Sequence, residues 1–260
     1  HVSVELLVPS QAGCPHDYSL RPRDVQAVLA ADVIVTHGLG AETFLNDPAF
    51  AEKQTSMLSI SDTCEAIFVG DHEQCDHEHD HEHEANIHAW VSPAQAVRQA
   101  RLLKDKLPAR LPMAGRERYR ANADTLIQRL EALDREYRTA SQQFANRTIV
   151  TFHEAFDYLA RDYGLEVAAT MSGAHSESPS AGQLAGIVDT ILKAKPGAIF
   201  HEPASPESHR LAKTLSAETG IPAYSLNPFN QTDGDTTLDA YERVMRQNLH
   251  TLTTALGNTR

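Results

Sequence analysis

Histidines recur at the ends of predicted strands and helices, where an α/β protein collects the groups that bind a ligand. His16 lies in the loop after the first apolar run of the chain, and His88 lies just before a predicted helix. His153 and His201 each directly follow a short apolar run. Neutral imidazole is a preferred ligand of zinc, and three imidazoles around an open position make a plausible zinc site. We therefore predict that His16, His88 and His153 bind one metal ion, with His201 as a further candidate.

The segment 71–84 is a second concentration of metal-binding side chains. It reads DHEQCDHEHDHEHE, with seven acidic residues, no Lys or Arg, and five histidines: His72, His77, His79, His81 and His83. It therefore carries −7 of the formal net charge of −12. Such a tract cannot bury an apolar face, so we expect a mobile loop. Imidazoles beside carboxylates attract zinc, which makes the five histidines candidates for auxiliary metal binding. The alternative is a solvated acidic loop whose histidines do little.

The elements that must position these residues alternate between strand and helix. In the first part we expect strands at 2–8, 32–37 and 57–60, and helices from Pro22, at 41–53 and at 94–107. Ser92 and Pro93 predict the start of the last helix, with Ser92 as its cap, and Pro108 predicts its end. In the second part we expect strands at 148–152, 165–170, 197–200 and 223–226, and helices at 153–163, 183–195, 206–219 and 237–256.

Residues 114–145 form the longest periodic stretch, with apolar side chains at steps of three, four and seven. A helix of about 30 residues would be about 45 Å long, so we predict that it runs between two lobes. A short dimeric coiled coil is the alternative, but the seam contains Ala, Asn and Thr. The predicted fold class is α/β: two lobes with mainly parallel sheets, 1–113 and 146–260, joined by the helix 114–145. Ligands bind beyond the carboxyl ends of parallel strands, which places the metal site in the cleft between the lobes, near Asn227 as well as the histidines.

The overall composition argues against nucleic-acid binding and a membrane span, and it leaves the pairing of the cysteines open. The chain has 260 residues and a net charge of −12, which argues against nucleic-acid binding. No apolar run approaches the roughly 20 residues of a membrane span. The three cysteines, Cys14, Cys64 and Cys75, allow one disulfide and one leftover thiol. Cys64–Cys75 has the shortest span, but the sequence does not choose among the pairings. Three unpaired thiols are also possible, and Cys75 is then a candidate soft metal ligand.

Four segments resemble those of the zinc-uptake solute-binding proteins of ABC transporters, in the receptor cluster for zinc and manganese. They are PHDYSLRP at 15–22, IHAWVSP at 87–93, FHEAFDY at 152–158 and FHEP at 200–203. The likeness covers nearly the whole chain, including the long helix and the His-rich loop. It implies a metal held between the lobes by His16, His88 and His153. An imidazole at position 153, where manganese receptors tend to have Glu, favours zinc.

The chain departs from the family pattern in three places. Pro15 precedes His16 where some zinc members have Glu, and Asn227 stands where many have Asp. About 30 residues that family members carry before the segment matching Val2–Val8 have no counterpart, so we expect a trimmed or processed chain. The fourth metal ligand is then water, a loop histidine or a nearby carboxylate. Asn227, His201 and Glu202 are the candidates for that position or its near surroundings.

The resemblance implies an extracytoplasmic receptor that captures Zn²⁺ and delivers it to a membrane permease, without catalysis. We expect a monomer that is periplasmic or lipid-anchored. Glu154, Asp157 and Glu202 are candidates to orient the imidazole rings through hydrogen bonds. Zinc affinity should fall as the pH approaches the histidine pKa of about 6.5. The His-rich loop would collect zinc for the cleft or report zinc sufficiency to the transporter.

Three other functions are compatible with a three-histidine site. A zinc-dependent hydrolase would use the open position to activate water. However, Asp157 stands where the two-histidine metalloprotease motif that begins at His153 would need its second histidine. A metal-binding adhesin is the second alternative, although no exposed apolar stripe supports it. A soluble zinc chaperone or buffer is the third.

Overall fold

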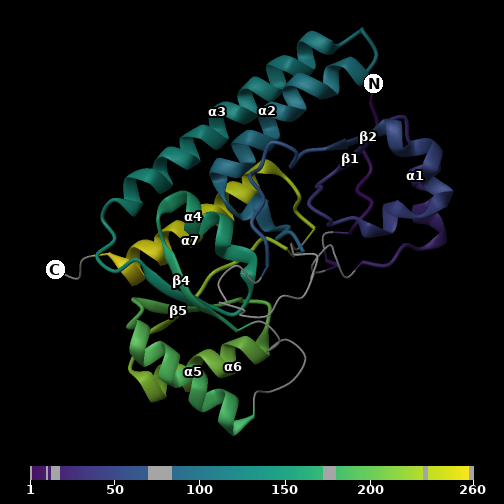
Figure 1. The fold of residues 1–260 in the computed structure, drawn as a ribbon. Coiled ribbons are helices and arrows are strands. Elements are labelled where there is room, and N and C mark those ends of the chain that lie inside the picture. Colours follow the sequence, from purple (N-terminus) through teal and green to yellow (C-terminus); the bar gives the residue numbers. More distant parts are fainter. Residues whose placement is uncertain are drawn as a thin grey trace.

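The computed structural model describes residues 2–9, 11–12, 18–69, 84–171, 180–230 and 234–257 (Figure 1). The predictions for His16, Cys14, Cys75 and the five loop histidines therefore fall outside the described residues. The described part contains two parallel sheets, one of two strands in the order β1-β2 and one of four in the order β4-β3-β5-β6. Helices accompany both sheets, which confirms the α/β class.

The four-stranded sheet lies in the second half of the chain and is buried on both faces. Its strands are β3 (Thr148–Thr151), β4 (Glu166–Thr170), β5 (Ala198–His201) and β6 (Ala223–Ser225). The helices around it are α4 (Asp157–Tyr163), α5 (Ala181–Ala194), α6 (Pro206–Thr219) and α7 (Leu238–Leu256). Successive strand residues point to opposite faces, so Ile149 packs in the core with α4 and α7, whereas Val150 packs in the core with α5 and α6.

This sheet brings two of the predicted site histidines to one edge. β3 and β5 are parallel neighbours, with Thr151 opposite Phe200. The chain reaches His153 just after β3, and His201 is the last residue of β5 rather than the first residue beyond it. Because the carboxyl ends of parallel strands meet at one edge of a sheet, both histidines lie at the edge where ligands bind in such folds.

The N-terminal part is smaller and less regular. It consists of α1 (Pro22–Ala30), β1 (Ile34–Thr36), the 3₁₀ segments η2 (Thr43–Asn46) and η3 (Pro48–Ser56), and β2 (Met57–Ser59). Val28, Ile34, Leu45 and Phe50 form its buried core. The helix expected at 41–53 is present as these two 3₁₀ segments rather than as one continuous helix. Asp47 and Pro48 divide the segment, and the side chain of Asp47 accepts a hydrogen bond from the Ala49 N–H at the start of η3.

The predicted strand at 2–8 is wrong. Residues 2–9 belong to no strand in the described part of the chain. Val4 and Leu6 are 89% and 61% exposed, and Leu7 packs against the small N-terminal core. An alternating apolar pattern favours a strand only where a neighbouring backbone can pair with it, because unpaired strand backbone gains no ladder hydrogen bonds.

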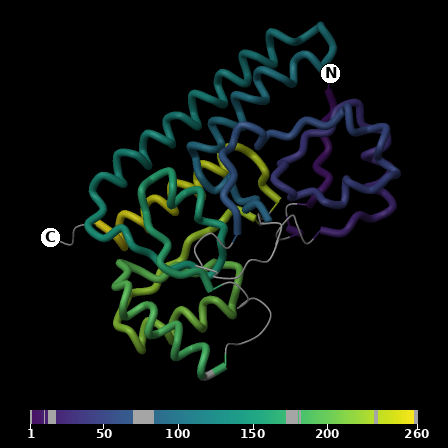
Figure 2. Tube along the Cα trace, in the orientation of Figure 1, coloured from purple at the N-terminus to yellow at the C-terminus, as the bar shows by residue number. Residues whose placement is uncertain are grey.

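Two long helices lie side by side as an antiparallel hairpin, in teal in Figures 1 and 2. They are α2 (Pro93–Arg110), which follows the 3₁₀ segment η4 (His88–Val91), and α3 (Arg116–Ser141). The hairpin turns at Gly115, whose φ of 103° suits glycine. Pro108 lies inside the last turn of α2 and does not end it. Ser92 does not cap α2 with its side chain, because its hydroxyl donates to Asp162 Oδ2 instead, at 2.6 Å.

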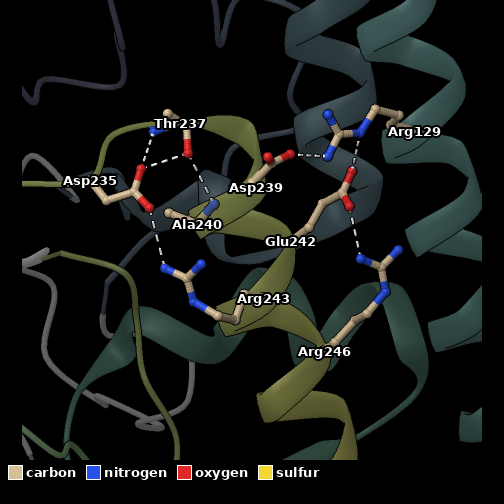
Figure 3. A network of polar contacts seen from close by, with 8 residues as sticks. All are labelled: Arg129, Asp235, Thr237, Asp239, Ala240, Glu242, Arg243 and Arg246. Atoms are coloured by element: carbon tan, nitrogen blue, oxygen red, sulfur yellow. Dashed lines mark hydrogen bonds and ion pairs between the residues drawn. The ribbon is translucent and has the colours of Figure 1, made fainter.

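The helix α3 contacts elements from both halves of the chain. It packs along α2, which itself reaches the N-terminal part through Arg110, whose guanidinium donates to the Thr55 carbonyl at 2.9 Å. On its other side α3 meets α7 through charged groups, with Arg129 Nε donating to Glu242 Oε1 at 2.8 Å (Figure 3). With 26 residues it is about 39 Å long. The boundaries at 113 and 145 stay predictions.

Two further sequence expectations meet the structure here. The thiol of Cys64 is free, so a Cys64–Cys75 disulfide is not formed, and burial raises the pKa of this thiol. Within the described ranges, no helix has both the length and the apolar character that crossing a membrane requires.

Candidate metal centre

Two of the three predicted ligands lie against each other. His88 is the first residue of η4, and His153 follows β3 at the edge of the four-stranded sheet. Their ring centroids are 4.4 Å apart, and the rings are nearly perpendicular, at 83°. Segments separated by 64 residues therefore bring their imidazoles together, as the sequence predicted. His16, the third predicted ligand, lies outside the described residues.

The ring of His88 is oriented by Asn86, a residue that the sequence analysis did not identify. Asn86 Oδ1 lies 2.9 Å from His88 Nδ1 and also accepts the His88 backbone N–H at 2.9 Å. Because an amide oxygen only accepts, His88 Nδ1 carries the hydrogen and Nε2 carries the lone pair that a metal would bind. The signal in the sequence is weak, since an asparagine between Ala85 and Ile87 looks like an ordinary loop residue.

Asn86 is itself fixed from the other half of the chain. Its Nδ2 donates to the Glu154 carbonyl at 2.7 Å and to Asp157 Oδ2 at 3.1 Å. Asn86 and Asp157 are both buried, which strengthens these hydrogen bonds relative to water. Asp157 thus acts on His88 through Asn86, one step further from the ring than the sequence suggested. Glu154 contributes a backbone oxygen to this contact.

The ring of His153 is oriented by Glu202. Glu202 Oε1 lies 3.0 Å from His153 Nδ1, and Glu202 is only 6% exposed. Burial pulls the pKa of His153 down, but the hydrogen bond and charge of Glu202 override it, so the pKa lies above the ordinary value. A carboxylate on Nδ1 fixes the tautomer that presents Nε2 and makes the ring a stronger metal ligand. The predicted role of Glu202 beside the site agrees with this contact.

A stack of aromatic rings continues from His88 into the N-terminal part. Trp90 lies 5.2 Å from His88 between ring centroids, and His37 lies 5.0 Å from Trp90 in an edge-to-face arrangement. The indole Nε1 of Trp90 donates to the Pro228 carbonyl at 2.9 Å, which fixes the ring. Burial lowers the pKa of His37 to about 4, so its ring is neutral at pH 7.

His201 and Asn227, the other candidates for the fourth position, make different contacts. His201 Nδ1 lies 3.2 Å from the Glu202 carbonyl, and His201 Nε2 lies 3.4 Å from Nδ1 of His209. Burial lowers the pKa of His201. Asn227 Oδ1 accepts the Phe229 backbone N–H at 2.8 Å. Neither set of contacts directs a donor atom to the His88–His153 pair, and their role as ligands stays a prediction.

The two ends of the His-rich segment meet close to His88. Phe68 and Ala85 form an antiparallel bridge, and the Val69 N–H donates to the Glu84 carbonyl at 2.9 Å. The hydroxyl of Tyr158 links the two flanks of the segment, because it donates to the Asn86 carbonyl and accepts a hydrogen bond from the Ile67 N–H. The residues on either side of the His-rich segment are therefore paired with each other, and the second of these flanks directly precedes Asn86.

The described residues supply part of a metal site. In the described ranges, no three His, Cys, Asp or Glu side chains are arranged to hold a metal ion together. His88 and His153 supply two imidazoles, each with an acceptor on Nδ1, and this donor set suits zinc. A complete zinc site needs further ligands, and His16 is the predicted third.

Glu202→Gln should lower the pKa of His153 in the metal-free protein. The charge and hydrogen bond of the carboxylate raise this pKa, whereas burial alone would lower it. An amide removes the charge, so the midpoint of the His153 imidazole titration, followed by NMR, should move to lower pH.

Glu207→Gln is the matched control. It removes one charge from an exposed residue of α6 that pairs with Arg210. The His153 midpoint should stay where it is in this variant. An unchanged midpoint in Glu202→Gln would show that the carboxylate does not control the ring.

Comparisons of the chain with known proteins point to one family. The family model described as ZnuA, zinc-uptake complex component A, periplasmic, matches residues 1–255. The zinc-binding lipoprotein AdcA of Streptococcus pneumoniae TIGR4 is 33% identical over 257 residues, covering 96% of this chain and 50% of AdcA. The high-affinity zinc uptake system protein ZnuA of Bacillus subtilis is 29% identical, covering 97% of this chain and 80% of that protein. The chain thus spans about half the length of the AdcA relative.

Solved structures share the fold. The Zn(II)-bound ZnuA-like domain of Streptococcus pneumoniae AdcA superposes with a TM-score of 0.78 at 29% identity, covering 98% of this chain and 91% of that domain. The SBP FpvC of Pseudomonas aeruginosa in complex with Mn²⁺ superposes with a TM-score of 0.74 at 26% identity, covering 96% of this chain and 88% of that one. The relatives named here carry names of binding and uptake proteins, and none carries the name of an enzyme.

Proposed function

The chain belongs to the family of periplasmic zinc-uptake components, and from that premise we propose that it is an extracytoplasmic receptor that captures Zn²⁺ and delivers it to the permease of an ABC importer. The observation that carries the proposal is the His88–His153 pair. Two imidazoles from different halves of the chain lie 4.4 Å apart, each with its Nδ1 hydrogen directed to a buried acceptor. This arrangement presents both Nε2 atoms in the tautomer that binds zinc.

The proposed ligands of Zn²⁺ are His16, His88 and His153. Glu202 contacts His153 on Nδ1, the nitrogen away from the proposed metal, so it serves as an orienting partner. Asn227 uses its amide oxygen in a turn with Phe229. We therefore infer that water or a histidine of the segment 72–83 completes the coordination, and that no catalytic step is performed on the ion.

Release of zinc should be coupled to protons at His153. Binding requires the neutral imidazole, and the raised pKa of His153 means that protons compete for this ring at a higher pH than for an ordinary histidine. A fall in pH should therefore weaken zinc binding. Because α3 packs against both α2 and α7, we expect release to involve small shifts rather than a wide hinge opening.

The His-rich segment is proposed to collect zinc weakly beside the tight site. The residues that flank it, Phe68 and Ala85, are paired with each other. Removal of residues 72–83 should therefore leave this pairing and Asn86 in place. The intact protein should bind one tight equivalent of Zn²⁺ and additional weak equivalents. The deletion should retain the tight equivalent and lose weak ones, as measured by calorimetric titration with a chelator competition for the tight site.

The same titration tests the receptor proposal. If the intact protein binds no equivalent of Zn²⁺ tightly, the receptor proposal is contradicted. If the number of weakly bound equivalents is the same after the deletion, only metal binding by the segment is contradicted. We further propose that the protein lies outside the inner membrane, in the periplasm or on a lipid anchor, and that it is a monomer. The permease is proposed as its partner, and the two-lobe division at residues 113 and 145 as its domain organisation.

A further inference from the structure

His201 and His209 form a second imidazole pair, separate from the His88–His153 contact. His201 ends β5, and His209 lies in the first turn of α6. His201 Nε2 and His209 Nδ1 are 3.4 Å apart, and the ring centroids are 4.8 Å apart at 75°. Two nitrogens bound to one tetrahedral Zn²⁺ at about 2.0–2.1 Å lie about 3.3 Å from each other. The separation in the protein matches that bite.

The pair is held in this geometry by the short connection between β5 and α6. His201 Nδ1 lies 3.2 Å from the Glu202 carbonyl, so Nδ1 carries the hydrogen and Nε2 carries the lone pair. Ser205 Oγ accepts the Ser208 N–H at 3.2 Å, and the Ser205 carbonyl accepts the His209 N–H at 3.1 Å. The first turn of α6 is thereby fixed, and His209 with it.

The surroundings of the pair indicate a site that solvent can reach and that would bind zinc weakly. His201 is 8% exposed, whereas His209 lies on the surface. Water can therefore complete the coordination of an ion on the outer side. The amino-terminal end of a helix carries a partial positive charge and disfavours a nearby cation. Glu207 lies in the same turn and opposes that effect.

From this geometry we propose that His201 Nε2 and His209 Nδ1 form a second, weaker binding site for Zn²⁺ on the C-terminal part of the protein. A direct hydrogen bond from His209 Nδ1 to His201 Nε2 is the competing explanation, but 3.4 Å is longer than the 2.7–3.2 Å of ordinary protein hydrogen bonds. The site does not include the His88–His153 pair, and it requires no residue of the His-rich segment.

The test is a histidine-selective ¹⁵N NMR titration of the full chain with Zn²⁺ alone. Beyond the first equivalent, Nε2 of His201 and Nδ1 of His209 should both show the shifts of metal-bound nitrogen. His209→Gln should abolish the shift at His201 and weaken binding at this site about tenfold or more, because one of two protein ligands is lost. His250→Gln, an exposed histidine of α7, is the matched control and should leave both shifts intact.

Two results would overturn the proposal. The first is a His209 Nδ1 hydrogen that persists, coupled to His201 Nε2, throughout the titration, which would establish the hydrogen bond only. The second is a His201 shift that survives His209→Gln, which would assign the metal to other ligands. The resonances of His88 and His153 in the same spectra report the proposed tight site separately, so failure of one site is distinguishable from failure of the other.

Discussion

His153→Ala should lower the affinity for Zn²⁺ by more than about 100-fold, since loss of an outer partner of a metal ligand alone costs about 10- to 100-fold. The substitution removes one proposed ligand and leaves Glu202, which is 6% exposed, without the imidazole that it contacts at 3.0 Å. A buried carboxylate without that partner also lowers the stability of the fold, which is an effect separate from the loss of zinc affinity. Competition with a chelator of known affinity measures the change at pH 7.

The zinc affinity of His153→Ala should be compared with that of a variant that lacks residues 72–83. That deletion should leave the tight affinity within a small factor of the intact protein. Equal losses from His153→Ala and from the deletion would contradict the assignment of the tight site to the His88–His153 pair. Circular dichroism and thermal unfolding of His153→Ala serve as the folding control. The residue lies beyond β3, and its side chain makes no helix-cap hydrogen bond.

The second half of the chain shows what a sequence pattern can predict. Short runs of β-branched residues, such as TIVT at 148–151, favour a strand in a sheet that is covered on both faces. The helix expected at 206–219 is α6, which begins at Pro206 with Ser205 as its cap. Gly220 ends it with a φ of 73°. Local patterns succeed where packing and capping agree with them.

The sequence pattern fails where a distant residue decides the local structure. Ser92 looks like a helix cap, but Asp162, 70 positions away, takes its hydroxyl. The alternating residues 2–8 look like a strand, yet no backbone pairs with them in the described part of the chain. Asn86 was missed as a metal-site residue because only its contacts with Glu154 and Asp157 give it a role.

The candidate site follows the same rule. Position at a strand end predicted His153 and the neighbourhood of Glu202, because parallel strands bring their carboxyl ends together whatever their order in the chain. His88 was predicted from its place just before a helix. The pairing of His201 with His209 could not be predicted in this way. It depends on the length and conformation of the connection from β5 to α6, which orients two rings eight residues apart.

The network between α3 and α7 is the other place where distant residues decide, and Glu242→Ala tests it. Glu242 is 8% exposed and accepts hydrogen bonds from Arg129 on α3 and from Arg246 on α7, both at 2.8 Å (Figure 3). Breaking a buried ion pair costs about 3–5 kcal/mol, but the two arginine side chains are 40% and 43% exposed and can return to water. We therefore expect the free energy of unfolding to fall by about 2 kcal/mol, measured by urea denaturation.

The pH dependence of the same variant distinguishes loss of charge from loss of packing. Burial raises the pKa of Glu242, but the hydrogen bonds and charges of Arg129 and Arg246 outweigh it and hold the pKa below its ordinary value. The carboxylate therefore stabilises the fold above its unfolded-state pKa, and this contribution disappears as the pH falls through the folded-state pKa. The difference in unfolding free energy between the intact protein and Glu242→Ala should shrink over that acidic range.

Asp235→Asn, an exposed partner of Arg243, should show a much smaller difference at neutral pH. A difference for Glu242→Ala that stays constant with pH would assign the loss to side-chain packing and not to the ion pairs that join α3 to α7.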